Sequence, residues 1–204
     1  MKVKLLFLLM LIICFTGTVW ASQPMDVIQG PVDQVVNLLS DPEYQDSDRR
    51  ATQREKIRGV INPMFDYTEV AKRALVRNWR IFSPDERKEF TGVFSEFLAN
   101  TYLSKIEGSI TDLKVVYVGQ KLISDTKATV RTRIIRETVE TPLDYSLKLK
   151  NGNWRVYDVK VEGVSLVKNY RTQFKKILMN ETPAQLIDRL RQKLHAQQSD
   201  GAVE

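Results

Sequence analysis

The sequence predicts an α+β fold in which N- and C-terminal helices surround a twisted antiparallel sheet. Helical periodicity occupies both ends of the chain, four segments of alternating apolar and polar residues lie together between 113 and 161, and an Asn-Gly pair joins the last two segments. The chain has 204 residues, of which 43% are hydrophobic and 27% are charged. This is the composition of one globular domain and excludes a disordered chain.

The first residues have the pattern of an export signal. Lys2 and Lys4 precede an apolar run from Leu5 to Trp20, and the small residues that follow predict cleavage after Ala21. An uncleaved membrane anchor is the alternative, but a stable span needs about 20 apolar residues and this run is shorter. We therefore expect a periplasmic protein made of a signal peptide at 1–21, a single domain at 22–195 and a flexible tail at 196–204.

The only cysteine, Cys14, lies inside the predicted signal peptide. Lipoprotein processing at Cys14 is not expected, because Ile13 stands where that processing needs a small residue. The mature chain therefore has no disulfide, no thiol nucleophile and no thiolate metal site, which suits a periplasmic domain stabilised by its own core.

The charge of the mature chain is mildly positive. Removing Lys2 and Lys4 from the 31 basic residues leaves 29 against 25 acidic residues, a net charge of +4, and the charges are interspersed. This balance could assist docking on an anionic lipid surface, and an ordinary solubilising surface explains it equally well. A nucleic-acid partner is not expected, because the chain has no basic aromatic motif.

Three helical segments are expected before residue 83. The first covers about 26–40, is interrupted near Gly30-Pro31 and stops at Asp41-Pro42. The second covers about 47–64, where apolar residues recur at helical spacing, and a third, short helix covers about 67–76.

The next helix has the clearest start signal in the sequence. Ser83-Pro84-Asp85-Glu86 combines a capping residue, a proline at the first helical position and a glutamate that can complete a capping box. The apolar stripe that follows has a period near 3.6 residues and includes Phe90, Phe94, Leu98 and Tyr102. We expect this helix to lay an aromatic face against an apolar surface.

Four strands are expected to form an antiparallel meander with one strongly apolar face. Asn151-Gly152 predicts a two-residue turn between the third and fourth strands, because both central residues of such a turn need positive φ. The resulting register places Lys150 opposite Asn153, Leu149 opposite Trp154, Leu147 opposite Val156, and Tyr145 opposite Asp158. Two helices follow the sheet, one capped by Ser165 and one starting with a capping box at Thr182-Pro183-Ala184-Gln185.

No constellation typical of an enzyme is present in the mature chain. A hydrolase or isomerase needs a nucleophile or general base with an orienting partner. His195, the only histidine, lies among polar residues at the end of the last helix, where the helix dipole favours it. A transition-metal site is not expected from one histidine and no mature cysteine, and the isolated glycines form no phosphate-binding loop.

Asp158 is the one polar residue that the predicted register places on the apolar face. A carboxylate there needs a hydrogen-bond partner or a raised pKa. It could act as a general base in a pocket, with Tyr145 as its partner, or it could accept a hydrogen bond from a tyrosine hydroxyl or from the backbone near Glu162-Gly163. We favour the structural role, because no second catalytic group accompanies Asp158.

The sequence resembles the MlaC family of periplasmic phospholipid-binding proteins, also called toluene-tolerance or ABC-transporter auxiliary proteins. The most specific segment contains Trp154-Arg155-Val156-Tyr157-Asp158, then Glu162-Gly163-Val164-Ser165, and then Asn169-Tyr170-Arg171. Asn78-Trp79-Arg80 and Ser83-Pro84-Asp85-Glu86-Arg87 precede Phe90 in the family's order. The resemblance covers essentially the whole mature chain.

The resemblance implies a carrier without catalysis or cofactor, whose cargo is glycerophospholipid. Such a carrier would move lipid between the outer membrane of a Gram-negative cell and an inner-membrane ABC transporter, and so maintain outer-membrane lipid asymmetry. Implied partners are an Mla-type ABC transporter complex and an outer-membrane MlaA-type lipoprotein complex. The implied fold is a cone like that of nuclear transport factor 2-like domains, wrapped by helices around an apolar cavity.

The predicted apolar stripes supply the expected lining of that cavity. The expected lipid-binding residues are Phe94, Leu98, Tyr102, Val130, Ile134, Leu143, Tyr145, Leu147, Val156, Val164 and Val167. Periodicity alone does not distinguish a filled core from a lined cavity, so two alternatives stay open: a pocket enzyme that uses Asp158, and a periplasmic adaptor with a filled core. We expect a monomer, because no self-complementary apolar helix is left over.

Overall fold

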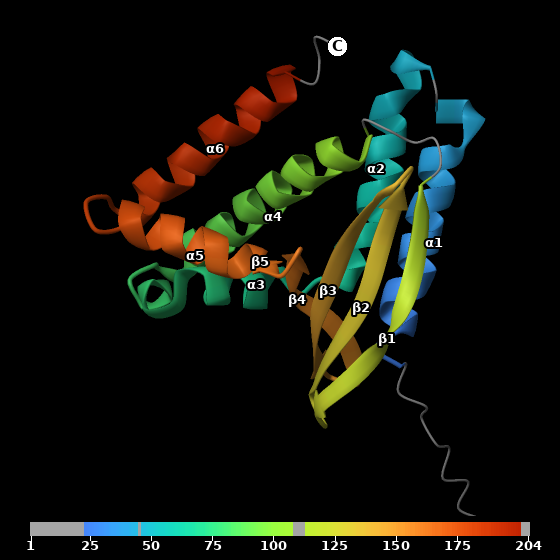
Figure 1. Cartoon of the computed structure of the whole chain (residues 1–204). Helices are drawn as coiled ribbons and strands as arrows, with labels where there is room; N and C mark the ends of the chain where they lie inside the picture. Colours follow the sequence, from blue (N-terminus) through green and yellow to red (C-terminus); the bar gives the residue numbers. More distant parts are fainter. Residues whose placement is uncertain (1–22, 45, 108–112, 201–204) are drawn as a thin grey trace, which may run out of the picture.

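The computed structural model describes residues 23–44, 46–107 and 113–200 (Figure 1). The predicted signal peptide and its cleavage site lie outside these residues. Within them, six α-helices and one five-stranded antiparallel sheet form the α+β fold that the sequence predicts. None of the described helices is both long enough and apolar enough to cross a membrane.

The helices before residue 83 are α1 (Asp26–Ser40), α2 (Arg50–Ile61) and α3 (Tyr67–Leu75). The predicted interruption of α1 is wrong, because the helix continues through Gly30 and Pro31. Pro31 lies just after the first turn, so the proline ring removes only one hydrogen bond of the helix. The second segment is divided into α2 and flanking 3₁₀ turns at Ser47–Arg49 and Asn62–Met64.

The later helices begin where their capping residues predict. They are α4 (Pro84–Glu107), α5 (Leu166–Ile177) and α6 (Pro183–Asp200). At α4, the Ser83 N–H donates to the Glu86 carboxylate at 2.8 Å and the Glu86 N–H donates to Ser83 Oγ at 3.2 Å. Thr182 and Gln185 make the same reciprocal pair before α6. Because α6 continues to Asp200, the described part of the predicted tail is helical.

The five strands pair in chain order. They are β1 (Lys114–Ser124), β2 (Lys127–Arg136), β3 (Val139–Lys150), β4 (Asn153–Val161) and β5 (Val164–Ser165). β1 continues past a bulge at Val118, where Gly119 adopts a φ of 146°. The bulge interrupts the alternation of apolar and polar residues, so alternation alone does not predict the full length of this strand.

The β3–β4 hairpin follows the predicted register only as far as a bulge. Asn151 and Gly152 have φ values of 51° and 77°, and Leu147 lies opposite Val156 as predicted. The predicted Tyr145–Asp158 pair is wrong. One extra residue, Tyr157, stands between the pairs Leu147–Val156 and Ser146–Asp158, so Tyr145 lies opposite Val159.

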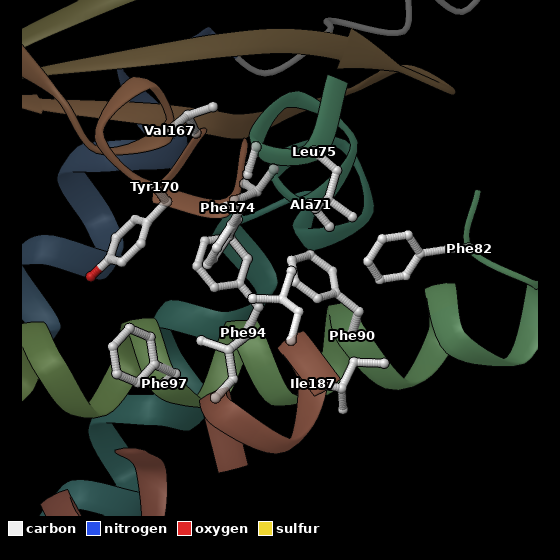
Figure 2. Packing of buried hydrophobic residues seen from close by; sticks show 14 residues of the cluster. Ala71, Leu75, Phe82, Phe90, Phe94, Phe97, Val167, Tyr170, Phe174 and Ile187 are labelled. Atoms are coloured by element: carbon white, nitrogen blue, oxygen red, sulfur yellow. The ribbon is translucent and has the colours of Figure 1, made fainter. Parts of the chain in front are cut away.

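Two buried clusters form most of the core. The first, here called the helical cluster, joins α3, α4, α5 and α6 around the aromatic rings drawn in Figure 2. The second, the sheet cluster, packs one face of the sheet against α1 and the turn before α3; its buried members are Ile28, Met64, Ala128, Val130, Leu147, Trp154 and Val156. We call this side of the sheet the inner face and the opposite side the outer face.

The two halves are joined along the edge of β4. Phe65 forms a parallel bridge with Val156, and the Asp66 N–H donates to the Val156 carbonyl at 2.9 Å. Asp66 then caps α3 by accepting a hydrogen bond from the Glu69 N–H at 3.0 Å. The α3 helix is therefore tied to the sheet at its first residue.

Candidate functional site

One end of the inner face is closed by the protein's own side chains. Val130, Leu147 and Val156 are fully buried and belong to the sheet cluster together with Ile28 of α1. These three predicted lining residues therefore act as core in this structure. Close packing of this kind fixes the position of α1 on the sheet.

The other end of the inner face carries half-buried apolar side chains. Of the predicted lining residues, Ile134, Leu143 and Tyr145 lie there. The bulge at Tyr157 brings Val159 opposite Tyr145 and Val161 opposite Leu143, so both valines join the same apolar surface. The alternation of β4 gave no sign of these two residues, because a bulge exchanges the faces of all residues that follow it.

The predicted lining residues Phe94, Leu98 and Val167 of α4 and α5 belong to the helical cluster and not to the sheet cluster. Phe94 is buried, and its ring centroid lies 5.1 Å from that of Phe174 and 5.2 Å from that of Tyr170 (Figure 2). Offset and edge-to-face rings at such separations form a solid core, so Phe94 acts as a core residue of the helical cluster. Leu98 is half-buried at the margin of the helical cluster, and Val167 is buried within it.

The tyrosines of this region stay uncharged at neutral pH. Burial raises the pKa of Tyr145 above its ordinary value, and burial also raises the pKa of Tyr102, with a further contribution from Tyr170. Tyr102 is half-buried on α4, one turn beyond Leu98. The predicted lining residues between sheet and helices thus provide apolar surface and neutral hydroxyl groups.

Val164 lies at the edge of the sheet, opposite Val161, and is more exposed than the other predicted lining residues. Its side chain is 62% exposed at the start of β5, directly after a turn in which Glu162 and Gly163 have φ values of 51° and 80°. A valine so exposed contributes nothing to the core, which is consistent with a place at the entrance of a site.

Asp158 is not on the inner face and does not face Tyr145. Its carboxylate accepts a hydrogen bond from Ser165 Oγ at 2.6 Å and from the Val167 N–H at 3.1 Å, while Ser165 Oγ itself accepts from the Lys168 N–H at 3.0 Å. This arrangement satisfies donors at the start of α5 and places a negative charge at its positive end. The favoured structural role is correct in kind, but its partners are Ser165 and the α5 backbone.

Two hollows in the described chain lie along α6, away from the sheet. One, of about 50 Å³, lies between α5 and α6 and includes Tyr170, Ile177 and Leu190. The other is an open depression over the polar side chains Glu181, Gln185 and Arg189. Neither is bordered by the predicted lining residues of the sheet, so the candidate site on the inner face is a surface of half-buried apolar side chains and is neither of these hollows.

Comparison with known proteins gives three consistent matches. The family described as "MlaC protein" matches residues 29–192. The toluene tolerance protein ttg2D of Pseudomonas putida is 26% identical over 169 residues, covering 77% of this chain and 74% of that protein. A phospholipid-binding protein from Ralstonia solanacearum, solved in complex with a phospholipid, has 21% identity and a TM-score of 0.74 over 86% of this chain and 99% of its own.

Proposed function

The chain belongs to the MlaC family, and from this premise we propose that it is a periplasmic carrier that binds glycerophospholipid between the sheet and the helices. The carrier exchanges lipid with an outer-membrane complex and with an inner-membrane ABC transporter. The observation that carries the proposal is the half-buried apolar surface formed by Ile134, Leu143, Tyr145, Val159 and Val161 on the inner face. The Ralstonia protein, which shares the fold, was solved with a phospholipid bound.

Burial of acyl chains supplies the driving force for binding. Two chains contain some tens of methylene groups, and burying each is worth about 0.8 kcal/mol, so the gross gain is roughly 20 kcal/mol. Association and ordering take back a large part of that gain. Binding therefore depends on a dry apolar surface, and few fixed contacts to the head group are needed.

The arrangement of polar groups argues against the pocket-enzyme alternative. A general base on the inner face would have to be Asp158, and its carboxylate is instead occupied by Ser165 and Val167 at the start of α5. The partner considered from the sequence, Tyr145, is half-buried on the opposite face of the sheet, and burial raises its pKa. We therefore propose binding without turnover.

The decisive experiment is mass spectrometry of gently purified mature protein under native conditions. A carrier should retain phospholipid in about one-to-one proportion, whereas an adaptor with a filled core should carry none. Absence of lipid from the wild-type protein, and failure of delipidated protein to extract lipid from phospholipid vesicles, would refute the proposal.

A substitution at Val164 tests the position of the entrance. We expect Val164→Glu to abolish lipid retention, because it places a charge where acyl chains enter, while the fold stays intact because the side chain is exposed. Met179→Glu is the matched control, since Met179 is 74% exposed in the loop between α5 and α6. Retention of lipid by Val164→Glu would place the entrance elsewhere without affecting the result for the wild type.

A further inference from the structure

The outer face of the sheet holds more positive charge than the mature chain as a whole. Strand pairing places nine basic and three acidic residues on this face. The basic residues are Lys114, Lys121, Lys127, Arg131, Arg133, Lys148, Lys150, Arg155 and Lys160, and the acidic residues are Glu140, Asp144 and Asp158. The other residues after position 21 comprise 20 basic and 22 acidic residues, so the excess charge belongs to this one face.

Three of these cations stand in one row across three strands. Lys127 lies directly opposite Lys148, and Lys148 lies directly opposite Arg155. Directly opposed side chains on one face have Cβ atoms only about 5 Å apart, and like charges in such positions destabilise a sheet. The fold therefore keeps a row of cations that works against its own stability.

Ion pairs among the described residues reach three of the nine cations: Lys148 pairs with Glu69, Lys150 with Asp66, and Arg133 with Glu140. A carboxylate oxygen of Glu69 on α3 lies 3.7 Å from Lys148 Nζ, and the Arg155 guanidinium donates a hydrogen bond to the Pro63 carbonyl oxygen at 2.6 Å. Lys127 and Arg131, both exposed on β2, form no ion pair with any residue in the described part of the chain. On β2, Arg133 is paired with Glu140, and Arg131 lies opposite Asp144 without an ion pair, so Lys127 and Arg131 remain open to a negatively charged partner.

We propose that the outer face of the sheet is a docking surface for an acidic protein, whose carboxylates complement these cations. The strand register holds the cations at fixed spacing, which a folded partner can match residue by residue. The middle of the face carries the short polar residues Thr129 and Ser146, paired with each other, and its aliphatic residues Val116 and Ile135 are half-buried, whereas membrane insertion requires exposed aliphatic anchors. A protein surface fits this pattern better than a lipid bilayer does.

The docking surface and the candidate lipid site lie on opposite faces of the same sheet. A partner on the outer face would leave the entrance at Val164 and the inner face free, so docking and cargo exchange can occur together. This inference extends the proposed carrier function by giving it a partner surface, but the surface itself does not require bound lipid. The two ideas can therefore fail separately.

The test compares two charge reversals of equal size. The variant Lys127→Glu/Arg131→Glu changes the outer face, and the control Lys88→Glu/Lys193→Glu changes exposed positions on α4 and α6. Binding of the mature proteins to a fluorescein-labelled glutamate homopolymer is measured by anisotropy at several salt concentrations. We expect the outer-face variant to lose roughly tenfold in affinity and the control to stay within about twofold, with salt weakening all binding.

Parallel measurements separate the possible outcomes. Equal weakening by both variants would show that net charge alone matters and would overturn the proposal. Face-dependent binding to vesicles of phosphatidylcholine and phosphatidylglycerol, without face-dependent binding to the homopolymer, would overturn the choice of a protein partner. Lipid content of each variant is measured separately, and we expect it to equal that of the wild type.

The stability of a single variant provides an independent check. Lys127→Glu replaces a repulsive contact with Lys148 by an attractive one, so we expect its urea midpoint to be higher than that of the wild type. A lower midpoint would show that the row of cations has no stability cost and would remove the reason for proposing a partner.

Discussion

Replacement of Asp158 should separate a structural carboxylate from a catalytic one. Asp158→Ala removes two hydrogen bonds to a charged acceptor, from Ser165 Oγ and the Val167 N–H, and leaves both donors partly buried. Hydrogen bonds to a charged group are each worth about 1.5–3 kcal/mol, and the charge at the α5 N-terminus adds about 0.3–1 kcal/mol. Because these contributions are not additive, we expect a loss of about 3 kcal/mol.

Urea unfolding of the mature protein measures this loss. With a slope of about 2 kcal/mol per molar, the midpoint should fall by about 1.5 M. Asp158→Asn keeps one acceptor oxygen and should lose about half as much. Asp188→Ala is the control, because Asp188 is exposed and only reaches Arg191 at 3.3 Å; its midpoint should hardly move.

Lipid retention completes the test of Asp158. A binding protein should retain lipid in every Asp158 variant that folds, since the carboxylate does not reach the inner face. If Asp158→Ala unfolds at the wild-type midpoint, the carboxylate does not anchor α5 and the reasoning is refuted. If the wild-type protein chemically converts bound lipid at a measurable rate and a stable Asp158→Asn variant does not, the carrier interpretation is wrong.

Three further substitutions test the core, the turn and the junction between sheet and helices. Phe94→Ala removes a ring from the helical cluster and should cost about 3–5 kcal/mol in urea unfolding. Gly152→Val forces a branched side chain to a φ of 77° and should cost at least about 1–2 kcal/mol by the same assay. Burial alone would raise the pKa of Asp66, but hydrogen bonds from Lys150 and the Glu69 N–H hold it below its ordinary value. Its contribution to stability is therefore complete above the unfolded pKa of about 3.9 and is lost as pH falls through the lower folded pKa, so the stability difference from Asp66→Asn should shrink on acidification from pH 5.

Local signals in the sequence were sufficient wherever a short motif decides the structure by itself. The capping boxes at Ser83 and Thr182 have the predicted reciprocal hydrogen bonds, and Asn151-Gly152 sets the start of the hairpin register. Such motifs succeed because all their partners lie within four residues. The continuous α1 through Pro31 was missed, because the cost of a proline depends on its distance from the helix start.

The candidate site depended on contacts that periodicity does not encode. Apolar spacing predicted Phe94 and Leu143 equally well, yet Phe94 is solid core and Leu143 is half-buried on the open part of the inner face. The bulge that brings Val159 and Val161 into the site has no sequence signal of its own, since Tyr157 is neither glycine nor a turn residue. Only the packing of α5 and α3 against β4 selects it.

The extra residue in β4 has a mechanical consequence for the whole domain. The centroid of the Tyr157 ring lies 3.9 Å from the Arg73 guanidinium carbon on α3. The next residue, Asp158, accepts the two hydrogen bonds that hold the start of α5. Deleting Tyr157 would remove its contact with Arg73 and straighten β4, but Asp158 would still lie opposite Ser146 and Val159 would still lie opposite Tyr145. An extra residue inserted after Asp158 would instead turn Val159 and Val161 to the outer face, so such an insertion should be far less tolerable than a length change in the β1–β2 turn.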